Sequence, residues 1–244
     1  MSGHNKWSKV KNIKAKNDAQ NAKIFTKIGR EIAVAVKAGG ADPNTNTALK
    51  NLISKARSYN MPNDNINRSI KKASGEVNSI NYEKITYEGY GPSGSAIIVE
   101  ALTDNKNRTA SDVRHIFDKF GGNLGSTGCV SYLFDNLGQF VFEQNEKLTE
   151  DDMTMMVLDS GADDMIVDDG CFIVSCQPAN FDAVKKYFDD NNIAYLEAGV
   201  EMVPQSYITI PDDKIASFNK LIEGLEDNDD VQEVYHNVDN CDVE

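Results

Sequence analysis

The chain has 244 residues and a formal net charge of −13 at neutral pH, from 25 lysines and arginines against 38 aspartates and glutamates. This length allows more than one domain with its own hydrophobic core. The apolar runs are too short for a membrane helix, and the basic start lacks the apolar core of a secretory signal, so we expect neither. Four cysteines without a CxxC pair and three histidines argue against a structural zinc site. We therefore expect a cytoplasmic protein with free thiols.

The charge is divided unevenly along the chain. Residues 1–76 contain fifteen lysines and arginines against five acidic residues, a net of +10, and the remaining 168 residues carry a net of −23. A basic segment in an acidic chain indicates a polyanion as its partner. We therefore predict that residues 1–76 bind nucleic acid, with the acidic part as scaffold, spacer or second contact.

Residues 1–20 are rich in lysine, and their only sizeable apolar residues are Trp7, Val10 and Ile13. On a helix these lysines would point in nearly all directions, so no apolar face would form. We predict a tail that becomes ordered on its partner; the alternative is a tail that only aids solubility. Trp7 is a candidate for stacking on a base, which favours the first interpretation. The basic residues concerned are Lys6, Lys9, Lys11, Lys14 and Lys16.

Apolar residues at helical spacing predict three helices after this tail, over 24–36, about 46–59 and 62–75. Short connections between them predict a small helical bundle without room for a large cleft. Its outward faces are almost uniformly basic, which favours polyanion binding over simple solvation. The basic residues on these faces are Lys23, Lys27, Arg30, Lys37, Lys50, Lys55, Arg57, Arg68, Lys71 and Lys72.

The pattern changes to strands from residue 84. The segments ITYEGY and SAIIVEAL flank the turn sequence GPSG and predict a hairpin. A polar loop, TDNKNR, follows, and Thr109 with Asp112 is the predicted start of a helix that closes at the Gly121-Gly122 pair. The next segment, CVSYLF, is predicted to be a strand.

Residues 138–203 follow the order β-α-β-β-α-β, which is typical of a ferredoxin-like arrangement. After them come a strand-like SYITI, one helix and the strand VQEVYHNV, too little for a separate core. We predict that this last segment returns to the unit begun near residue 80. The fold class is thus α+β with three domains: a helical domain at 1–76, a discontinuous middle domain at 77–134 and 204–244, and an inserted ferredoxin-like domain at 135–203.

Long sequence motifs resemble the YebC family. They are GHNKWSKVK, KIFTKIGREI, AGGADPNTN, NMPNDNI, YEGYGPSG and TDNKNRTASDVRHIFDKFGGNLGSTGCVSYLF. The resemblance implies a helical head and two α+β domains, the last of them inserted. It also implies a probable transcriptional regulator that binds DNA through the head. The family includes the mitochondrial translational activator of cytochrome oxidase subunit I, and bacterial relatives are linked to the ribosome and to stalling at proline-rich sequences.

The chain departs from this family within the tail. Asn12-Ile13 and Gln20-Asn21-Ala22 stand where relatives commonly carry a His-Lys/Arg pair and a Lys-Arg-Gly run. Each lost phosphate contact lowers the salt slope of binding to duplex DNA by about 0.9. We therefore expect weaker binding than in relatives, unless the fold rather than the charge is recognised.

Catalytic and cofactor sites are not predicted. The loops GYGPSG and GGNLGSTG join two strands or follow a helix, whereas a phosphate loop follows a strand and opens a helix. His4, His115 and His236 lie far apart in sequence, and no catalytic triad can be argued from them. Two roles for the stretch Asn105–Arg108 are considered equally: a solvated loop, or a second contact to the nucleic-acid backbone.

We predict a non-enzymatic, nucleic-acid-binding regulator of gene expression, acting in transcription through DNA, with no cofactor. The alternatives are a ribosome-associated factor that binds ribosomal or transfer RNA and, more weakly, a protein-interaction scaffold. No helix-turn-helix with a polar reading face is evident, and the lysine-rich tail favours phosphate contacts over base reading. The predicted contact residues are Lys6, Trp7, Lys9, Lys11, Lys14, Lys16, Lys23, Lys27, Arg30, Lys55, Arg57, Arg68, Lys71 and Lys72.

Overall fold

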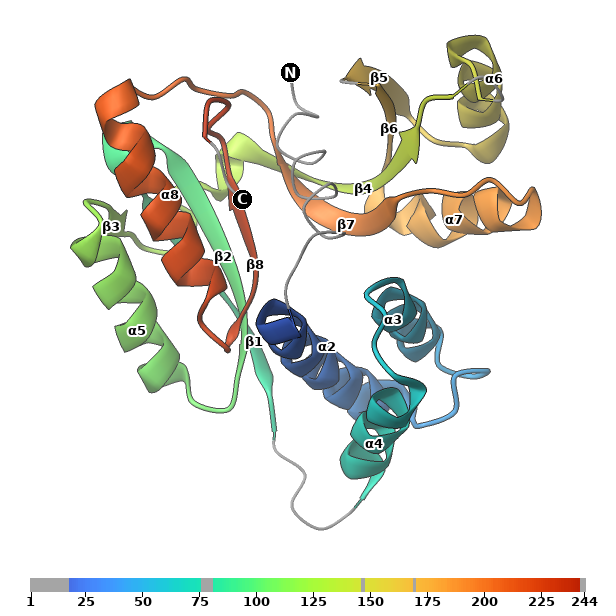
Figure 1. Cartoon of the computed structure of the whole chain (residues 1–244), viewed down its shortest axis with the longest axis horizontal. Helices are drawn as coiled ribbons and strands as arrows, with labels where there is room; N and C mark the ends of the chain where they lie inside the picture. The colour runs from blue at the N-terminus through green and yellow to red at the C-terminus, as the bar shows by residue number, and fades with distance from the viewer. Residues whose placement is uncertain (1–17, 76–80, 146–147, 169, 242–244) are drawn as a thin grey trace.

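The computed structural model describes residues 18–75, 81–145, 148–168 and 170–241, with the side chains of 18–20 left aside. Three units surround a common centre (Figure 1). A helical unit lies at the bottom of this view, a sheet backed by two helices at the left, and a second sheet with two helices at the upper right. The class is α+β, as predicted. Within the described ranges, no helix is both long enough and apolar enough to cross a membrane.

The helical unit consists of α2 (Asp18–Gly39), α3 (Thr47–Ser58) and α4 (Asn63–Ser74). Its core contains the predicted stripes, with Ile32, Leu49 and Ile66 almost completely buried. Asn46 fixes the junction between α2 and α3, because its side chain accepts a bond from the N–H of Leu49 at 3.1 Å. The same side chain donates to the carbonyls of Ala35 and Gly40, each at 2.8 Å. The three predicted helices are present, but α2 is longer than expected: it has 22 residues and begins at Asp18, ahead of the predicted start at residue 24.

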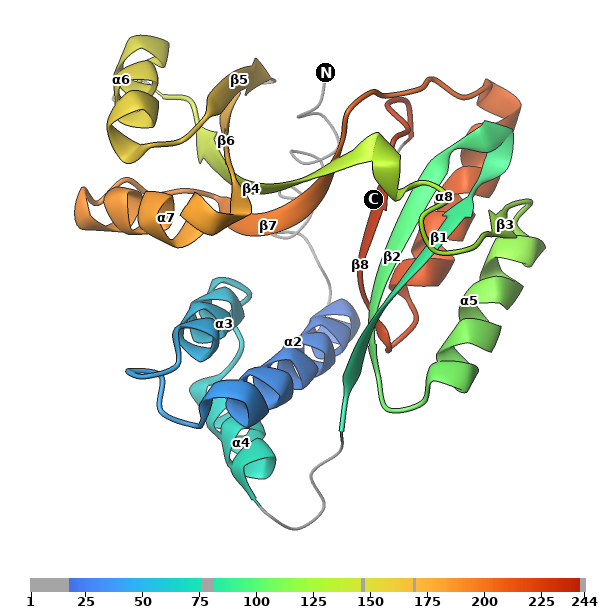
Figure 2. The ribbon, with the colours of Figure 1, turned by 180° about the vertical axis from the view of Figure 1, so that it is seen from behind.

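The first sheet has the order β3-β1-β2-β8. The predicted hairpin is present, with β1 (Glu83–Tyr90) antiparallel to β2 (Ala96–Thr103) around the short 3-10 helix Pro92–Gly94. The helices α5 (Lys106–Lys119) and α8 (Asp212–Glu226) cover the same face of the sheet (Figures 1 and 2). The remaining strands are β3 (Asn123–Leu124) and β8 (Val231–His236), and β8 pairs with β2 from more than a hundred residues away. The last segment therefore does return to this sheet.

The second sheet has the order β5-β6-β4-β7 with every pair antiparallel. Along the chain its elements are β4 (Phe134–Glu143), α6 (Glu150–Ser160), β5 (Asp164–Asp168), β6 (Cys171–Cys176), α7 (Phe181–Asp190) and β7 (Glu197–Pro204). This is the predicted β-α-β-β-α-β order, and the strand order is the one that a split βαβ unit requires. The pairing within each sheet supports the three-domain division at 1–76, 77–134 with 204–244, and 135–203, which stays a prediction.

Three local predictions are wrong. The helix α5 begins at Lys106 with Asn105 as its cap, so TDNKNR is only partly a loop and Thr109 lies inside the helix. Residues 131–133 of CVSYLF form a 3-10 helix, and only Phe134 belongs to a strand. In SYITI the only strand-like feature within the described residues is an isolated bridge between Ile208 and Val238.

Candidate nucleic-acid interface

Three basic residues of α2 face the acidic part of the chain. The amine of Lys23 lies 2.7 Å from the carboxylate of Asp227, and that of Lys27 donates to the backbone carbonyl of Glu226 at 2.8 Å. Both partners belong to the end of α8 or the turn after it. These contacts hold the first half of α2 against the end of α8, one of the two helices that cover the first sheet.

Arg30 and Asp230 form the centre of this contact, which we name the Asp230 clasp. The guanidinium of Arg30 donates to the carboxylate of Asp230 and to the carbonyl of Asp229, each at 2.6 Å. The second carboxylate oxygen of Asp230 accepts bonds from Arg108, Thr109 and Thr103 at 2.9, 2.7 and 3.1 Å. One buried carboxylate thus joins α2, β2, α5 and the turn before β8.

Burial of Asp230 opposes its ionisation, but the bonds from Arg108, Thr109, Arg30 and Thr103 outweigh burial and lower its pKa to about 2. Hydrogen bonds that are made only to the charged form of an acid produce such a shift. Asp230 is therefore ionised at neutral pH, and it neutralises much of the charge that Arg30 would otherwise offer to a phosphate.

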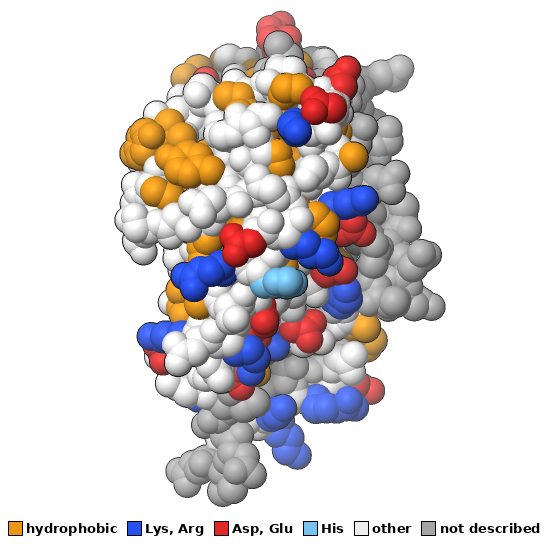
Figure 3. All heavy atoms as spheres, turned by 90° about the vertical axis from the view of Figure 1, so that its left-hand side faces the viewer, with side chains coloured by type: hydrophobic (Ala, Val, Ile, Leu, Met, Phe, Trp, Pro, Cys, Tyr) orange, Lys and Arg blue, Asp and Glu red, His pale blue; other side chains and the backbone are white. Residues whose placement is uncertain are grey.

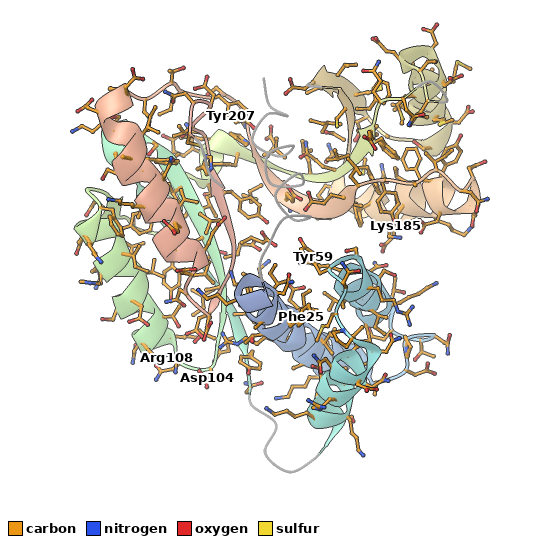
Figure 4. The ribbon with its side chains drawn as sticks, in the orientation of Figure 1. Phe25, Tyr59, Asp104, Arg108, Lys185 and Tyr207 are labelled. Carbon is orange, nitrogen blue, oxygen red and sulfur yellow. The ribbon has the colours of Figure 1, made fainter. Side chains whose placement is uncertain are left out.

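Lys55 of α3 joins the helical unit to the first sheet. Its amine lies 3.1 Å from Glu31 of α2 and 3.7 Å from Glu233 of β8. Burial alone would lower the pKa of Lys55, but the two carboxylates outweigh burial and raise it. Burial, together with the nearby Glu197 of β7, raises the pKa of Tyr59 at the end of α3 (Figure 4). Lys55 is therefore part of an internal ionic contact.

Four further predicted contact residues lie on the surface of α3 and α4. Arg68, Lys71 and Lys72 occur at positions i, i+3 and i+4 of α4, so they share one face of the helix. All three are exposed, as is Arg57 in the last turn of α3. Asp64 is the one acidic residue in these two helices. In the described part of the chain, none of the four basic side chains forms an ion pair. We name Arg57, Arg68, Lys71 and Lys72 the α3–α4 basic face.

The structure thus separates the predicted contact residues into three sets. Lys23, Lys27, Arg30 and Lys55 bind carboxylates or carbonyls of the same chain. Arg57, Arg68, Lys71 and Lys72 are available to a partner. Lys6, Trp7, Lys9, Lys11, Lys14 and Lys16 lie outside the described residues.

The second basic spot, Asn105–Arg108, forms the cap and first turn of α5 rather than an open loop. Arg108 lies 2.8 Å from Asp104 and 2.9 Å from Asp230, and Lys106 pairs with Glu83. Figure 4 places Asp104 and Arg108 together at this end of α5. The surface that carries α5 and α8 mixes basic and acidic side chains without a region of one sign (Figure 3). These observations favour capping and structural ion pairs over a second contact to nucleic acid.

The glycine-rich loop GGNLGSTG is closed on an internal anion. The carboxylate of Glu88, in β1, accepts bonds from the backbone N–H groups of Gly128, Val130 and Ser131 at 2.7, 2.9 and 2.8 Å. Burial opposes ionisation of Glu88, but these bonds outweigh burial and lower its pKa. The N–H of Gly128, at the end of this loop, is therefore already bonded to a carboxylate of the same chain. The same bonds explain why CVSYLF is not a strand: two of its N–H groups are unavailable to a ladder.

We expect Glu88→Gln to lower the free energy of unfolding by about 2–3 kcal/mol, because an amide leaves buried N–H donors unpaired. Urea unfolding would measure this loss. Glu83→Gln removes the exposed partner of Lys106 and is the matched control, with an expected loss below about 1 kcal/mol. Equal losses in the two variants would show that Glu88 does not organise the loop.

All four cysteines are free thiols. Among the residues that the structure describes, no three His, Cys, Asp or Glu side chains are grouped as a metal site requires. Sequence reasoning missed Asp230, whose role depends on partners about 120 and 200 residues away in sequence. No local motif marks such a residue; the only hint is an aspartate pair directly before a predicted strand.

Comparison with known proteins agrees with this architecture. Residues 5–76 match the "TACO1/YebC protein N-terminal domain", and residues 82–238 match the "TACO1/YebC second and third domain". A protein of Acetivibrio thermocellus named "Probable transcriptional regulatory protein" is 56% identical over 238 residues, covering 97% of this chain and 98% of its own. A protein of the same name from Finegoldia magna is 53% identical over 241 residues, covering 98% and 100%.

The fold is also found in a solved structure. The crystal structure of a conserved hypothetical protein from Aquifex aeolicus superposes with a TM-score of 0.82 and 39% identity, covering 92% of this chain and 93% of that chain. The predicted resemblance is thereby confirmed, and the chain belongs to the TACO1/YebC family.

Proposed function

We propose that this protein is a nucleic-acid-binding regulator of gene expression that acts in transcription by binding DNA. The observation that carries the proposal is the α3–α4 basic face, where four exposed cations stand against one carboxylate. The names of the relatives, which are probable transcriptional regulatory proteins, support a regulatory role. The lysine-rich N-terminal segment would add further contacts. In this proposal the protein acts in the cytoplasm and is not an enzyme.

The mode of binding that fits this surface is contact with phosphates. Lys71 and Lys72 supply mobile point charges, and the guanidinium groups of Arg57 and Arg68 also bind phosphate oxygens. On α4 the exposed face is Arg68, Lys71 and Lys72, which suits the backbone of a duplex. Selectivity for particular genes would then come from DNA shape or from additional partners.

A ribosome-associated role in translation is the second candidate. The same observation favours it, because a surface that contacts phosphates without reading bases also suits structured RNA. The two candidates differ in the nucleic acid that is bound in the cell, and they share the basic face.

Salt dependence of DNA binding tests the proposal. The four cations of the α3–α4 basic face should contribute a slope of about −3.6 to the plot of log affinity against log salt, from about 0.9 per phosphate contact. Between 50 and 200 mM salt, the affinity for a labelled duplex should therefore fall about 100-fold or more. An affinity that does not change with salt, or no measurable binding at 50 mM salt, would contradict the proposal.

A further inference from the structure

A hollow of about 270 Å³ lies between α2 and α4 and is closed on one side by Tyr82, just before β1. We name it the α2–α4 pocket. It is lined by one set of residues from each helix, which are Phe25, Thr26, Gly29, Arg30, Ala33 and Lys37 from α2 and Ser69, Lys72 and Ala73 from α4. Neither Phe25 nor Tyr82 was predicted from the sequence to be a functional residue.

Small side chains create the floor of this pocket. A methyl group on Gly29 would come within 3.4 Å of the Ser69 hydroxyl, so the two helices approach closely at this point. Ala33 and Ala73 extend the same small surface.

Aromatic rings and a fixed guanidinium form the walls. Arg30 lies over the ring of Tyr82, with 5.5 Å between the guanidinium carbon and the ring centre. The Asp230 clasp holds this guanidinium in place through two bonds of 2.6 Å. Phe25 is half-buried on α2 (Figure 4). Aromatic rings and arginine planes are the surfaces on which proteins stack single nucleobases.

Two lysines, Lys37 and Lys72, are among the side chains that line the pocket. Lys72 also belongs to the α3–α4 basic face, so the pocket opens beside the surface that we assign to the phosphate backbone. A strand bound along that surface would pass the mouth of the pocket.

We propose that the α2–α4 pocket holds one unstacked nucleotide of a single-stranded segment, with its base against Phe25 and Tyr82 and its phosphate near Lys72. The inference rests on the proposed nucleic-acid function and adds a preference to it. Bases in a continuous duplex are stacked and paired, so they cannot enter the pocket without being extruded. A single strand, bulge or end is therefore the preferred substrate.

The test uses the full-length protein with a single-stranded oligonucleotide that contains 2-aminopurine, and with the duplex of the same sequence. Stacking of the analogue on Tyr82 should change its fluorescence, and the single strand should bind about tenfold more tightly than the duplex. Parallel ribose and deoxyribose strands identify which sugar is preferred.

Two matched pairs of variants assign the preference to the pocket. Tyr82→Ala removes one wall, and Tyr132→Ala removes an exposed ring from the 3-10 helix Ser131–Leu133 instead. Lys72→Ala removes a cation that lines the pocket, and Lys71→Ala removes its neighbour on α4, which does not line it. Tyr82→Ala should lose about tenfold in affinity for the single strand and little for the duplex. Lys72→Ala should lose more on the single strand than Lys71→Ala.

Equal behaviour within both pairs, with binding retained, would overturn the pocket proposal and leave nucleic-acid binding in place. Absence of binding to single strand and duplex alike would overturn the proposed function together with the pocket. Circular dichroism on each variant confirms that the fold is intact.

Discussion

Replacing Asp230 by asparagine is expected to lower the free energy of unfolding by about 3–5 kcal/mol. The side chain of Asp230 is 6% exposed and that of Arg30 is 16% exposed, so removing one charge leaves the other buried without its partner. The neutral amide also offers one acceptor oxygen where the carboxylate accepts bonds from Arg30, Arg108, Thr103 and Thr109. The loss should be large because the clasp joins the helical unit to the first sheet.

Urea unfolding followed by circular dichroism measures this loss, and Asp229→Asn is its control. Asp229 is exposed and contributes a backbone carbonyl, not its carboxylate, to Arg30. The control should lose less than about 0.5 kcal/mol. A loss in Asp230→Asn as small as this would show that the clasp does not hold the two units together.

The pH dependence of stability provides a second readout of the clasp. The pKa of Asp230 is about 2 in the folded protein, below its ordinary value of 3.8. Its contribution is therefore present above about pH 4 and is lost as the pH falls through 2. The stability of the wild-type protein should fall over this window by more than that of Asp230→Asn. Parallel curves would contradict the assignment.

Reversing the charges of the α3–α4 basic face, with Arg57, Arg68, Lys71 and Lys72 all changed to glutamate, should weaken binding to nucleic acid by at least about 100-fold. Four phosphate contacts would be lost and replaced by repulsion. The four side chains are exposed and unpaired within the described residues, so the unfolding free energy should change by less than about 1 kcal/mol. Fluorescence anisotropy with a labelled duplex measures the first quantity and urea unfolding the second.

Net charge alone must be separated from the effect of this face. A control with Lys119, Lys186, Lys214 and Lys220 changed to glutamate makes the same change in net charge on α5, α7 and α8, where all four lysines are exposed. It should keep most of the affinity. An equal loss in the two variants would show that overall charge, not the α3–α4 basic face, governs binding.

The sequence predicts the architecture because the fold rests on periodic burial. The apolar stripes of the three head helices and the β-α-β-β-α-β order between 134 and 204 both appear as expected. The return of β8 to β2 was predictable because one helix and one strand cannot bury a core by themselves. In each case the spacing of apolar residues along the chain shows which face of a helix or strand must be buried against another element.

The distribution of the basic residues was not predictable in the same way. Arg30 and Lys55 have the same local pattern as Arg57 and Lys72, because all four lie on the outward side of amphipathic helices. Only the folded chain shows that the first two meet carboxylates about 180 to 200 residues away. Likewise, CVSYLF has the composition of a strand, but the carboxylate of Glu88 binds its backbone. Long-range polar contacts override local propensity at these positions.

In-cell crosslinking would identify the nucleic acid that the α3–α4 basic face contacts. The wild-type protein and the variant with four glutamates in the α3–α4 basic face would be crosslinked in cells, and the attached DNA and RNA sequenced. We expect the wild type to recover discrete fragments of DNA and the variant to lose them. Recovery of ribosomal or transfer RNA in place of DNA would contradict the transcriptional role and support the translational one. Equal recovery from both proteins would contradict the assignment of the interface itself.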